Sequence, residues 1–324
     1  MSFDHASSSL GRVVALSGGI GGAKLALGLR NVLEPNRLAI IANTGDDFEH
    51  LGLHISPDID TLLYTLSGMS DPERGWGRAN ETWNFMAAMA ELGGETWFRL
   101  GDRDLAMHIE RTRKLRAGDS LTAVTAETAA RLNLGCEVFP MTDTPVRTFV
   151  TTDEGRLAFQ DYFVRRQCRP AVTDISFEGI EEAIVGERLA EVLRGEVDAI
   201  VVCPSNPFIS IEPILAVPRM RELLRATGAP IVAVSPIIGR DSVKGPTAKM
   251  FREMGLESTS SEVAKRYSGF VDLMIFDASD AMERPKDMPV ITSHTFMASL
   301  EDREQLARVV LNAARASKDR MAYD

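Results

Sequence analysis

Two short apolar runs near the start of the chain flank a glycine-rich segment and a helical pattern. Arg12–Leu16 is apolar and stops at Ser17-Gly18-Gly19. Ala23–Leu33 then repeats apolar residues at helical spacing, and Arg37–Ala42 is a second apolar run that ends in an acidic loop. A strand, a glycine segment, a helix and a second strand in this order predict the opening of a doubly wound α/β sheet.

The same alternation returns in the second half of the chain. Three further apolar runs end at polar or proline residues, and they are Asp198–Cys203, Pro230–Val234 and Val271–Phe276. Uninterrupted apolar runs are typical of parallel strands that are buried on both faces. The helical stretches among them are Arg219–Ala226, Thr247–Glu253 and Leu300–Ala316. The pattern predicts an α/β fold with a Rossmann-like, doubly wound, mostly parallel sheet.

The stretch between these halves, approximately residues 56–165, has a different pattern. It begins with helical and loop-like segments, and it ends with Thr144–Thr152 and Arg156–Val164, which predict a hairpin. No Gly/Ser-rich linker separates it from the rest of the chain. We therefore expect one unit over residues 11–324, with an inserted, mainly helical cap subdomain packed on the sheet.

Two helices of this insertion have candidate N-caps. Asp102 is expected to cap a helix over Arg103–Arg116, and Ser120 is expected to cap the next helix, which would end near Gly135. The basic run Arg111–Arg116 is most simply the solvated C-terminal end of its helix, where cations offset the helix dipole.

Composition limits the classes of partner. The 324-residue chain has a formal net charge of −10, which disfavours nucleic acid and anionic membranes but leaves room for a local basic pocket. Cys136, Cys168 and Cys203 show no paired spacing, and the first ten residues do not resemble a signal peptide. We expect a cytoplasmic protein that acts on small molecules.

The glycine-rich segment after the first run is a candidate phosphate site. Gly18, Gly19, Gly21, Gly22 and Lys24 fall where a strand passes into a helix. Glycines permit close backbone approach, and a helix N-terminus offers free N–H groups and a partial positive charge. The segment lacks the ending of a P-loop and the third glycine of a dinucleotide fingerprint. A tight turn that merely requires glycine is the alternative.

Carboxylates follow the second strand. Asp46 and Asp47 end its loop, and Asp58 lies in the segment Ser56–Thr61. Acidic side chains beside a phosphate require a cation between them, and Mg²⁺ is usually held by one or two carboxylates plus substrate phosphates. We expect carboxylates of these two segments to hold a metal ion, and the pattern does not assign that role to any single Asp. Helix caps and Asx-turns are the alternative.

Two later loops also follow strands and are expected to reach the same crevice. Ser205 and Asn206 follow the run that ends at Cys203, and Lys244 and Gly245 precede the helix at Thr247. A lysine and an open glycine N–H suit a second phosphate or a nucleobase edge, although ordinary turn chemistry explains them equally well.

Histidine and tryptophan residues are less informative. Three histidines lack the spacing of a metal-binding motif, and we expect them to be structural or to lie on the surface. They are His50, His54 and His108. The tryptophans are expected to pack in a core or to form a wall for a flat ring, and they are Trp76, Trp83 and Trp97.

Taken together, the motifs resemble the 2-phospho-L-lactate transferases, which build the deazaflavin cofactor F420. Seven segments occur in the family's order, and they are Gly18–Lys24, Asn43–Asp47, Ser56–Thr61, Glu81–Trp83, Leu100–Leu105, Ser205–Pro207 and Lys244–Met250. The resemblance extends from about Arg12 to Leu311.

The resemblance implies a Mg²⁺-dependent enzyme with a Rossmann-like fold, often a homodimer. Its donor is a guanosine diphosphate that carries a three-carbon acid on its β-phosphate, and its acceptor is the ribityl hydroxyl of the deazaflavin Fo. The products are GMP and the F420 core. By motif match, Asp46 and Asp58 would be metal-associated, Gly19–Gly22 would lie against the nucleotide, and Asn206 and Lys244 would line the donor side. Asp46 or Asp47 would then be the candidate to orient or deprotonate the acceptor hydroxyl.

Some questions stay open at this point. A related family of nucleotide-sugar-binding regulators, of the gluconeogenesis-factor type, shares the glycine segment and a similar fold. An NAD-dependent dehydrogenase fits less well because the third fingerprint glycine is missing. The motifs also do not distinguish phospholactate, phosphoenolpyruvate and phosphoglycerate as the acid that is transferred.

Overall fold

The computed structural model describes residues 10–242 and 245–321 and has a seven-stranded sheet at its centre. The strand order is β14-β13-β10-β9-β1-β2-β5, and every neighbouring pair is parallel. The strands are β1 (Val13–Ser17), β2 (Leu38–Ala42), β5 (Glu137–Pro140), β9 (Ala199–Val202), β10 (Ile231–Val234), β13 (Leu273–Asp277) and β14 (Val290–Ser293). This confirms the predicted α/β, doubly wound, mostly parallel sheet.

Helices cover both faces of this sheet, and each face has its own apolar core. One face packs against α1 (Gly19–Val32), α2 (Pro57–Leu66), α5 (Leu121–Arg131) and α11 (Leu300–Met321). The other face packs against α6 (Glu187–Arg194), α7 (Glu212–Ala216), α8 (Met220–Ala226), α9 (Thr247–Glu253) and α10 (Ser260–Arg266). Burial on both faces explains the uninterrupted apolar strands.

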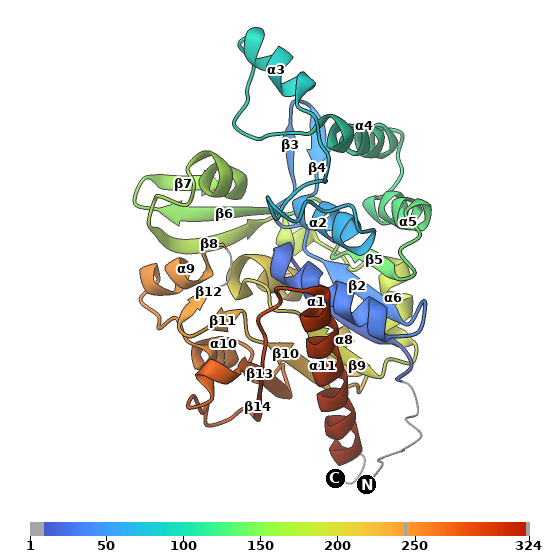
Figure 1. Ribbon diagram of the computed structural model, residues 1–324, viewed down its shortest axis with the longest axis vertical. Coiled ribbons are helices and arrows are strands. Elements are labelled where there is room, and N and C mark those ends of the chain that lie inside the picture. Colours follow the sequence, from blue (N-terminus) through green and yellow to red (C-terminus); the bar gives the residue numbers. More distant parts are fainter. Residues whose placement is uncertain (1–9, 243–244, 322–324) are drawn as a thin grey trace.

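Helices α1 and α11 lie side by side although they are far apart in sequence (Figure 1). Gly28 makes this packing possible, because a Cβ atom there would collide with the backbone carbonyl of Arg303. The close contact fixes α1, and therefore its N-terminus, on the sheet.

Much of the stretch 56–165, together with the hairpin directly before it, lies outside the central sheet. The hairpin of β3 (Phe48–His50) and β4 (Leu53–Ile55), together with α3 (Asn84–Glu91) and α4 (Asp102–Arg116), projects beyond the carboxyl ends of the strands (Figure 1). A second antiparallel sheet has the order β7-β6-β8 and comprises β6 (Arg147–Thr152), β7 (Gly155–Ala158) and β8 (Val172–Glu178). The predicted hairpin is thus present as β6 and β7, although its second strand is shorter than expected.

Several local predictions need correction. Strand β5 lies within 56–165 but pairs with β2, so the stretch contributes an edge strand to the central sheet. Gly101, not Asp102, is the N-cap of α4, and the Asp102 carboxylate instead accepts bonds from Thr82, Asn84 and Phe85. The sequence pattern missed β14, because its four residues are only partly buried.

The cap of the following helix was predicted correctly. Ser120 accepts a hydrogen bond from the backbone N–H of Ala123, although α5 ends at Arg131 rather than near Gly135. None of the helices in the described ranges combines the length and the apolar character needed to span a bilayer.

Candidate active site

A large cavity opens at the carboxyl ends of the central strands. Its volume is about 600 Å³, and it lies where doubly wound sheets bind ligands. One part is lined by the start of α1 and by the loops after β9 and β10, and these residues include Gly18, Gly19, Gly21, Lys24, Ser205, Asn206, Ser235 and Gly245. Other segments of the chain supply mainly aromatic residues to the lining, and these are Tyr64, Trp76, Trp97, Phe98, Phe159 and Phe163.

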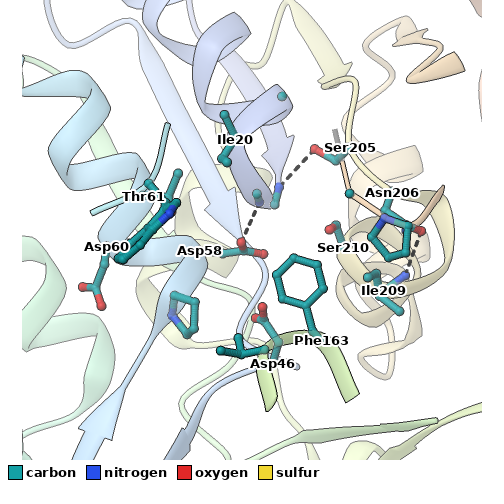
Figure 2. Close-up of a pocket in the computed structure, with 18 of the residues that line it drawn as sticks. Ile20, Asp46, Asp58, Asp60, Thr61, Phe163, Ser205, Asn206, Ile209 and Ser210 are labelled. Carbon is teal, nitrogen blue, oxygen red and sulfur yellow. Dashed lines mark hydrogen bonds between the residues drawn. The ribbon is translucent and has the colours of Figure 1, made fainter. Parts of the chain in front are cut away.

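The glycine segment forms the first turn of α1 rather than a loop before it. The helix begins at Gly19, whereas the apolar pattern suggested Ala23. Gly18 is the N-cap, and its N–H donates to the Ser205 hydroxyl at 3.2 Å. Gly19 has a φ of +64°, and its N–H donates to the Asp58 carboxylate at 2.6 Å (Figure 2). The sequence pattern placed the helix too late because glycines carry no apolar signal.

The other two glycines are required by packing. A Cβ atom on Gly21 would meet the Pro204 carbonyl oxygen, and one on Gly22 would meet the hydroxyls of Ser17 and Ser205. Gly21 lines the cavity, whereas Gly22 faces the loop after β9 and does not. The glycines therefore bring the N-terminus of α1 against this loop. We call the lining residues at this place the glycine rim, and they are Gly18, Gly19, Gly21 and Ser205.

Lys24 lines the cavity one turn further along α1. Its ammonium donates to the Met297 carbonyl at 2.7 Å, which holds the amine at the edge of the glycine rim. A cation at this place complements the partial positive charge of the helix N-terminus and suits a phosphate.

Asp46 and Asp58 meet at the floor of the cavity. The side-chain amide of Asn43 donates to Asp46 at 3.1 Å and to Asp58 at 2.9 Å, so the two carboxylates are neighbours (Figure 2). Both are buried and both line the cavity. Asp58 does not cap its own helix, as the alternative interpretation supposed; it accepts the N–H of Gly19 at the start of α1.

The electrostatics of this pair are unfavourable without a cation. Burial and the nearby charges of Asp58 and Asp47 raise the pKa of Asp46 well above its ordinary value. Burial raises the pKa of Asp58 to about 6, although the bonds from Asn43 and Gly19 oppose the shift. Each carboxylate is held ionised only at a cost in free energy, which a positive charge in the cavity would offset.

Asp47 points away from the cavity. Its carboxylate accepts a bond from the Ser56 hydroxyl at 2.7 Å and lies 3.1 Å from the His54 ring, and Asp47 is not among the described residues that line the cavity. Of the two adjacent acids in the loop, the geometry favours Asp46 for contact with a ligand.

The donor set fits Mg²⁺ bound together with a substrate. Nowhere in residues 10–242 and 245–321 do three or more His, Cys, Asp or Glu side chains form a metal-binding group. Asp46 and Asp58 supply two carboxylates, and Mg²⁺ commonly takes one or two from the protein and completes its shell with phosphate oxygens and water. The raised pKa values of both groups agree with a site built to hold a cation.

The loops after β9 and β10 contribute different groups to the cavity. Ser205 lies on the glycine rim, and Asn206 caps the π-helical turn η3 (Pro207–Ile211) by accepting the N–H of Phe208 at 2.9 Å. Both residues line the cavity, as does Gly245. Lys244 lies outside the described residues.

Two of the three tryptophans, Trp76 and Trp97, face the cavity. Trp83 is not among its described lining residues; it packs edge-on against Trp76, and the guanidinium of Arg99 stacks on it at 4.2 Å. Trp76 and Trp97 therefore form part of a wall of the cavity, whereas Trp83 has a packing role, and each of the two predicted roles applies to different tryptophans.

A buried polar cluster joins α4 to α2 beside the aromatic wall. Arg111 was expected at a solvated helix end, but it is 4% exposed and forms a two-pronged ion pair with Asp60. His108 is also buried and lies 3.2 Å from Asp104, which accepts the Tyr64 hydroxyl. The run of basic residues gave no indication of this, because a helix turns Arg111 inward while Arg113 points to solvent.

Sequence reasoning also missed the segment that follows β7. Phe159, Gln160 and Phe163 all line the cavity. Phe159 and Gln160 lie directly before the π-helical turn η1 (Asp161–Arg165), and Phe163 lies within it. Phe159 and Phe163 are stacked, with centroids 5.4 Å apart and an interplanar angle of 15°. Their spacing of four residues was a weak signal, and nothing marked Gln160.

Comparisons with known proteins agree with this geometry. The family model described as 2-phospho-L-lactate transferase CofD matches residues 13–313. The chain is 38% identical over 306 residues to a 2-phospho-L-lactate transferase from Methanosarcina mazei, covering 93% of this chain and 100% of the relative. It is 41% identical over 313 residues to a phosphoenolpyruvate transferase from Streptomyces coelicolor, covering 94% and 98% of the two chains.

The fold also has a counterpart among solved structures. A crystal structure of a upf0052 family protein from Bacillus halodurans superposes with a TM-score of 0.64 at 14% identity, covering 94% of this chain and 100% of that one. At this identity the likeness concerns the fold alone.

Proposed function

The chain belongs to the 2-phospho-L-lactate transferase CofD family, and from this membership we propose that it transfers a phospho-three-carbon-acid group from a guanosine diphosphate donor to the ribityl hydroxyl of Fo. The observation that carries the proposal is the pair Asp46 and Asp58, joined by Asn43 in one cavity. The glycine segment lines the same cavity, here called its donor half, and so do several aromatic side chains, here called its acceptor half. The two halves suit a nucleotide diphosphate and a flat heteroaromatic acceptor, respectively.

The donor half offers the groups that a diphosphate needs. The start of α1, the Ser205 hydroxyl and Lys24 form the rim, and N–H groups at a helix N-terminus favour phosphate. Asp46 and Asp58 would hold Mg²⁺, which when bound neutralises charge on the diphosphate. We propose that the guanosine lies toward the loops after β9 and β10.

The acceptor half offers stacking surface. Trp76, Trp97 and Phe163 line it, and aromatic faces bind flat rings by dispersion and offset stacking. An acceptor placed there would direct its ribityl chain toward Asp46 at the cavity floor.

The proposed reaction is a substitution at phosphorus. The acceptor oxygen forms a bond to the β-phosphorus, the bond from that phosphorus to the oxygen bridging to GMP breaks, and the hydroxyl proton is lost to a base. Asp46 is our candidate to accept that proton or to orient the hydroxyl, because its carboxylate lines the cavity whereas Asp47 is not among the described lining residues. Such transfers depend mainly on positioning and charge neutralisation.

Mass spectrometry of products made from Fo with the three donors in competition tests the proposal. We expect GMP release that requires Fo, stops when EDTA removes the metal and returns with added Mg²⁺. The relatives include both phospholactate and phosphoenolpyruvate transferases at similar identity, so the competition identifies the acid. Absence of GMP release with every donor would refute the proposal. A homodimer, which the resemblance implies, and a cytoplasmic location, which the composition implies, remain predictions.

A further inference from the structure

Gln160 connects the cap to the acidic loop. It lies between β7 and η1, and its side-chain amide donates to the Asp46 carbonyl at 3.3 Å and to the Asp46 carboxylate at 3.4 Å. It is 5% exposed. The bonded residues are 114 positions apart in sequence, so this contact exists only in the folded protein.

Gln160 and Asn43 hold Asp46 from two sides. Asn43 donates to one carboxylate oxygen at 3.1 Å, and Gln160 donates to the other at 3.4 Å. One donor on each oxygen fixes the rotation of the carboxylate plane, whereas a single donor would leave the group free to turn. The side-chain amides of Asn43 and Gln160 therefore set the direction in which the Asp46 carboxylate presents its remaining lone pairs. Of these two amides, that of Gln160 belongs to the cap.

The same short segment also carries part of the aromatic wall. Phe159 precedes Gln160 and stacks on Phe163, and all three line the cavity. Any shift of this segment therefore moves the wall and the amide together. The carboxylate at the floor and the acceptor half of the cavity are thus linked through one side chain.

We propose that Gln160 is a positioning residue that orients the Asp46 carboxylate toward the divalent cation and the acceptor hydroxyl. The inference rests on the proposed function in that it takes Asp46 to be the metal-associated carboxylate. Partners that orient metal-ligating carboxylates typically change metal affinity or activity by about 10–100-fold when they are replaced.

The test compares three variants of the full-length protein. Gln160→Met keeps the length of the side chain and removes the N–H donor. Gln160→His supplies an N–H donor again, from a ring nitrogen at a similar distance from the backbone. Gln305→Met makes the same change at an exposed position of α11 and serves as the control. Two readouts are taken: Mn²⁺ binding in the presence of GDP, by electron paramagnetic resonance, and steady-state kinetics with Fo and the preferred donor.

We expect Gln160→Met to weaken Mn²⁺ binding about 10-fold or more and to lower kcat about 10–100-fold, with little change in the KM for Fo. Gln160→His should recover part of both losses, and Gln305→Met should match the wild type. A residue that only supports the aromatic wall would raise the KM for Fo and leave metal binding unchanged.

The outcomes separate this inference from the proposed function. Normal Mn²⁺ binding by Gln160→Met, or equal loss in Gln160→His, overturns the positioning role even if the wild type is active. If the wild type releases no GMP from any donor, the proposed function fails, and the Mn²⁺ titration alone decides whether Gln160 orients Asp46.

Discussion

Single residues at the cavity floor show how burial prepares a carboxylate for its task. Asn43 brings Asp46 and Asp58 together in a site with little solvent. Burial raises the pKa of both acids, and the neighbouring charge of Asp58 raises that of Asp46 further. The arrangement lowers stability but prepares the site for a cation.

Replacing Asp46 tests its catalytic role. We expect Asp46→Asn to keep the fold and to lower kcat by about 10²–10⁴-fold, the usual contribution of a positioned proton acceptor. Glu49→Gln is the control, because Glu49 lies nearby in β3 with an exposed side chain. Steady-state GMP release measures both variants, and an unchanged kcat in Asp46→Asn would remove Asp46 from the site.

Replacing Asp58 tests the cost of its burial. The folded-state pKa of about 6 exceeds the ordinary value of 3.8, so between these values the native state binds more protons than the unfolded chain. The contribution of Asp58 to the stability of the metal-free protein should therefore fall as pH rises through about 4 to 6, by roughly 3 kcal/mol.

Asp58→Asn removes this penalty but loses one hydrogen bond, worth about 1 kcal/mol. We expect the variant to be more stable than the wild type at pH 7.5 in EDTA by about 1–2 kcal/mol, with the difference shrinking below pH 5 as the wild-type carboxyl protonates. Denaturant unfolding at several pH values measures this. A variant less stable than the wild type at pH 7.5 would contradict the argument.

At the scale of elements, α2 and α4 are held together by charge as well as by apolar packing. Asp60 lies one turn after the start of α2, and Arg111 lies in the last part of α4. Their ion pair is buried. It fixes α2, the helix that carries Asp58, against α4.

Breaking this pair should cost far more than breaking a surface pair. Arg111→Met leaves the Asp60 carboxylate buried without its partner, and we expect a loss of about 3–5 kcal/mol in the free energy of unfolding. Arg113→Met on the same helix breaks an exposed pair with Glu110 and should cost less than about 1 kcal/mol. Equal losses of unfolding free energy in the two variants would show that the buried ion pair stabilises the protein no more than the exposed one.

At the scale of the whole molecule, ligand binding should couple the two halves of the cavity to global stability. A ligand that binds only the folded state stabilises it by about 2.7 kcal/mol at one hundred times its Kd. GDP with Mg²⁺ should therefore raise Tm, and EDTA should abolish most of the increase.

A uridine diphosphate sugar provides the comparison in the same thermal unfolding experiment. It should have a smaller effect than GDP, because the family transfers a group from a guanosine diphosphate donor in our proposal. A larger increase in Tm with the uridine diphosphate sugar than with GDP would favour the nucleotide-binding regulator over the transferase. An increase in Tm with GDP that is unchanged by EDTA would do the same.

The sequence alone determined five of the seven strands of the central sheet. Strands buried on both faces are apolar throughout, and this local signal needs no knowledge of partners, so β1, β2, β9, β10 and β13 were predicted from their runs. The rule that parallel strands end at one edge of a sheet then placed the glycine segment and the acids near one crevice.

Only the tertiary structure decided which side chains enter that crevice. Asp46 and Asp47 are adjacent, yet only Asp46 is among the described lining residues, because the loop turns between them. Arg111 and Gln160 acquire their roles from Asp60 and Asp46, which are 51 and 114 positions away. Contacts over such separations leave no local pattern in the chain, because they depend on how the cap packs against the sheet.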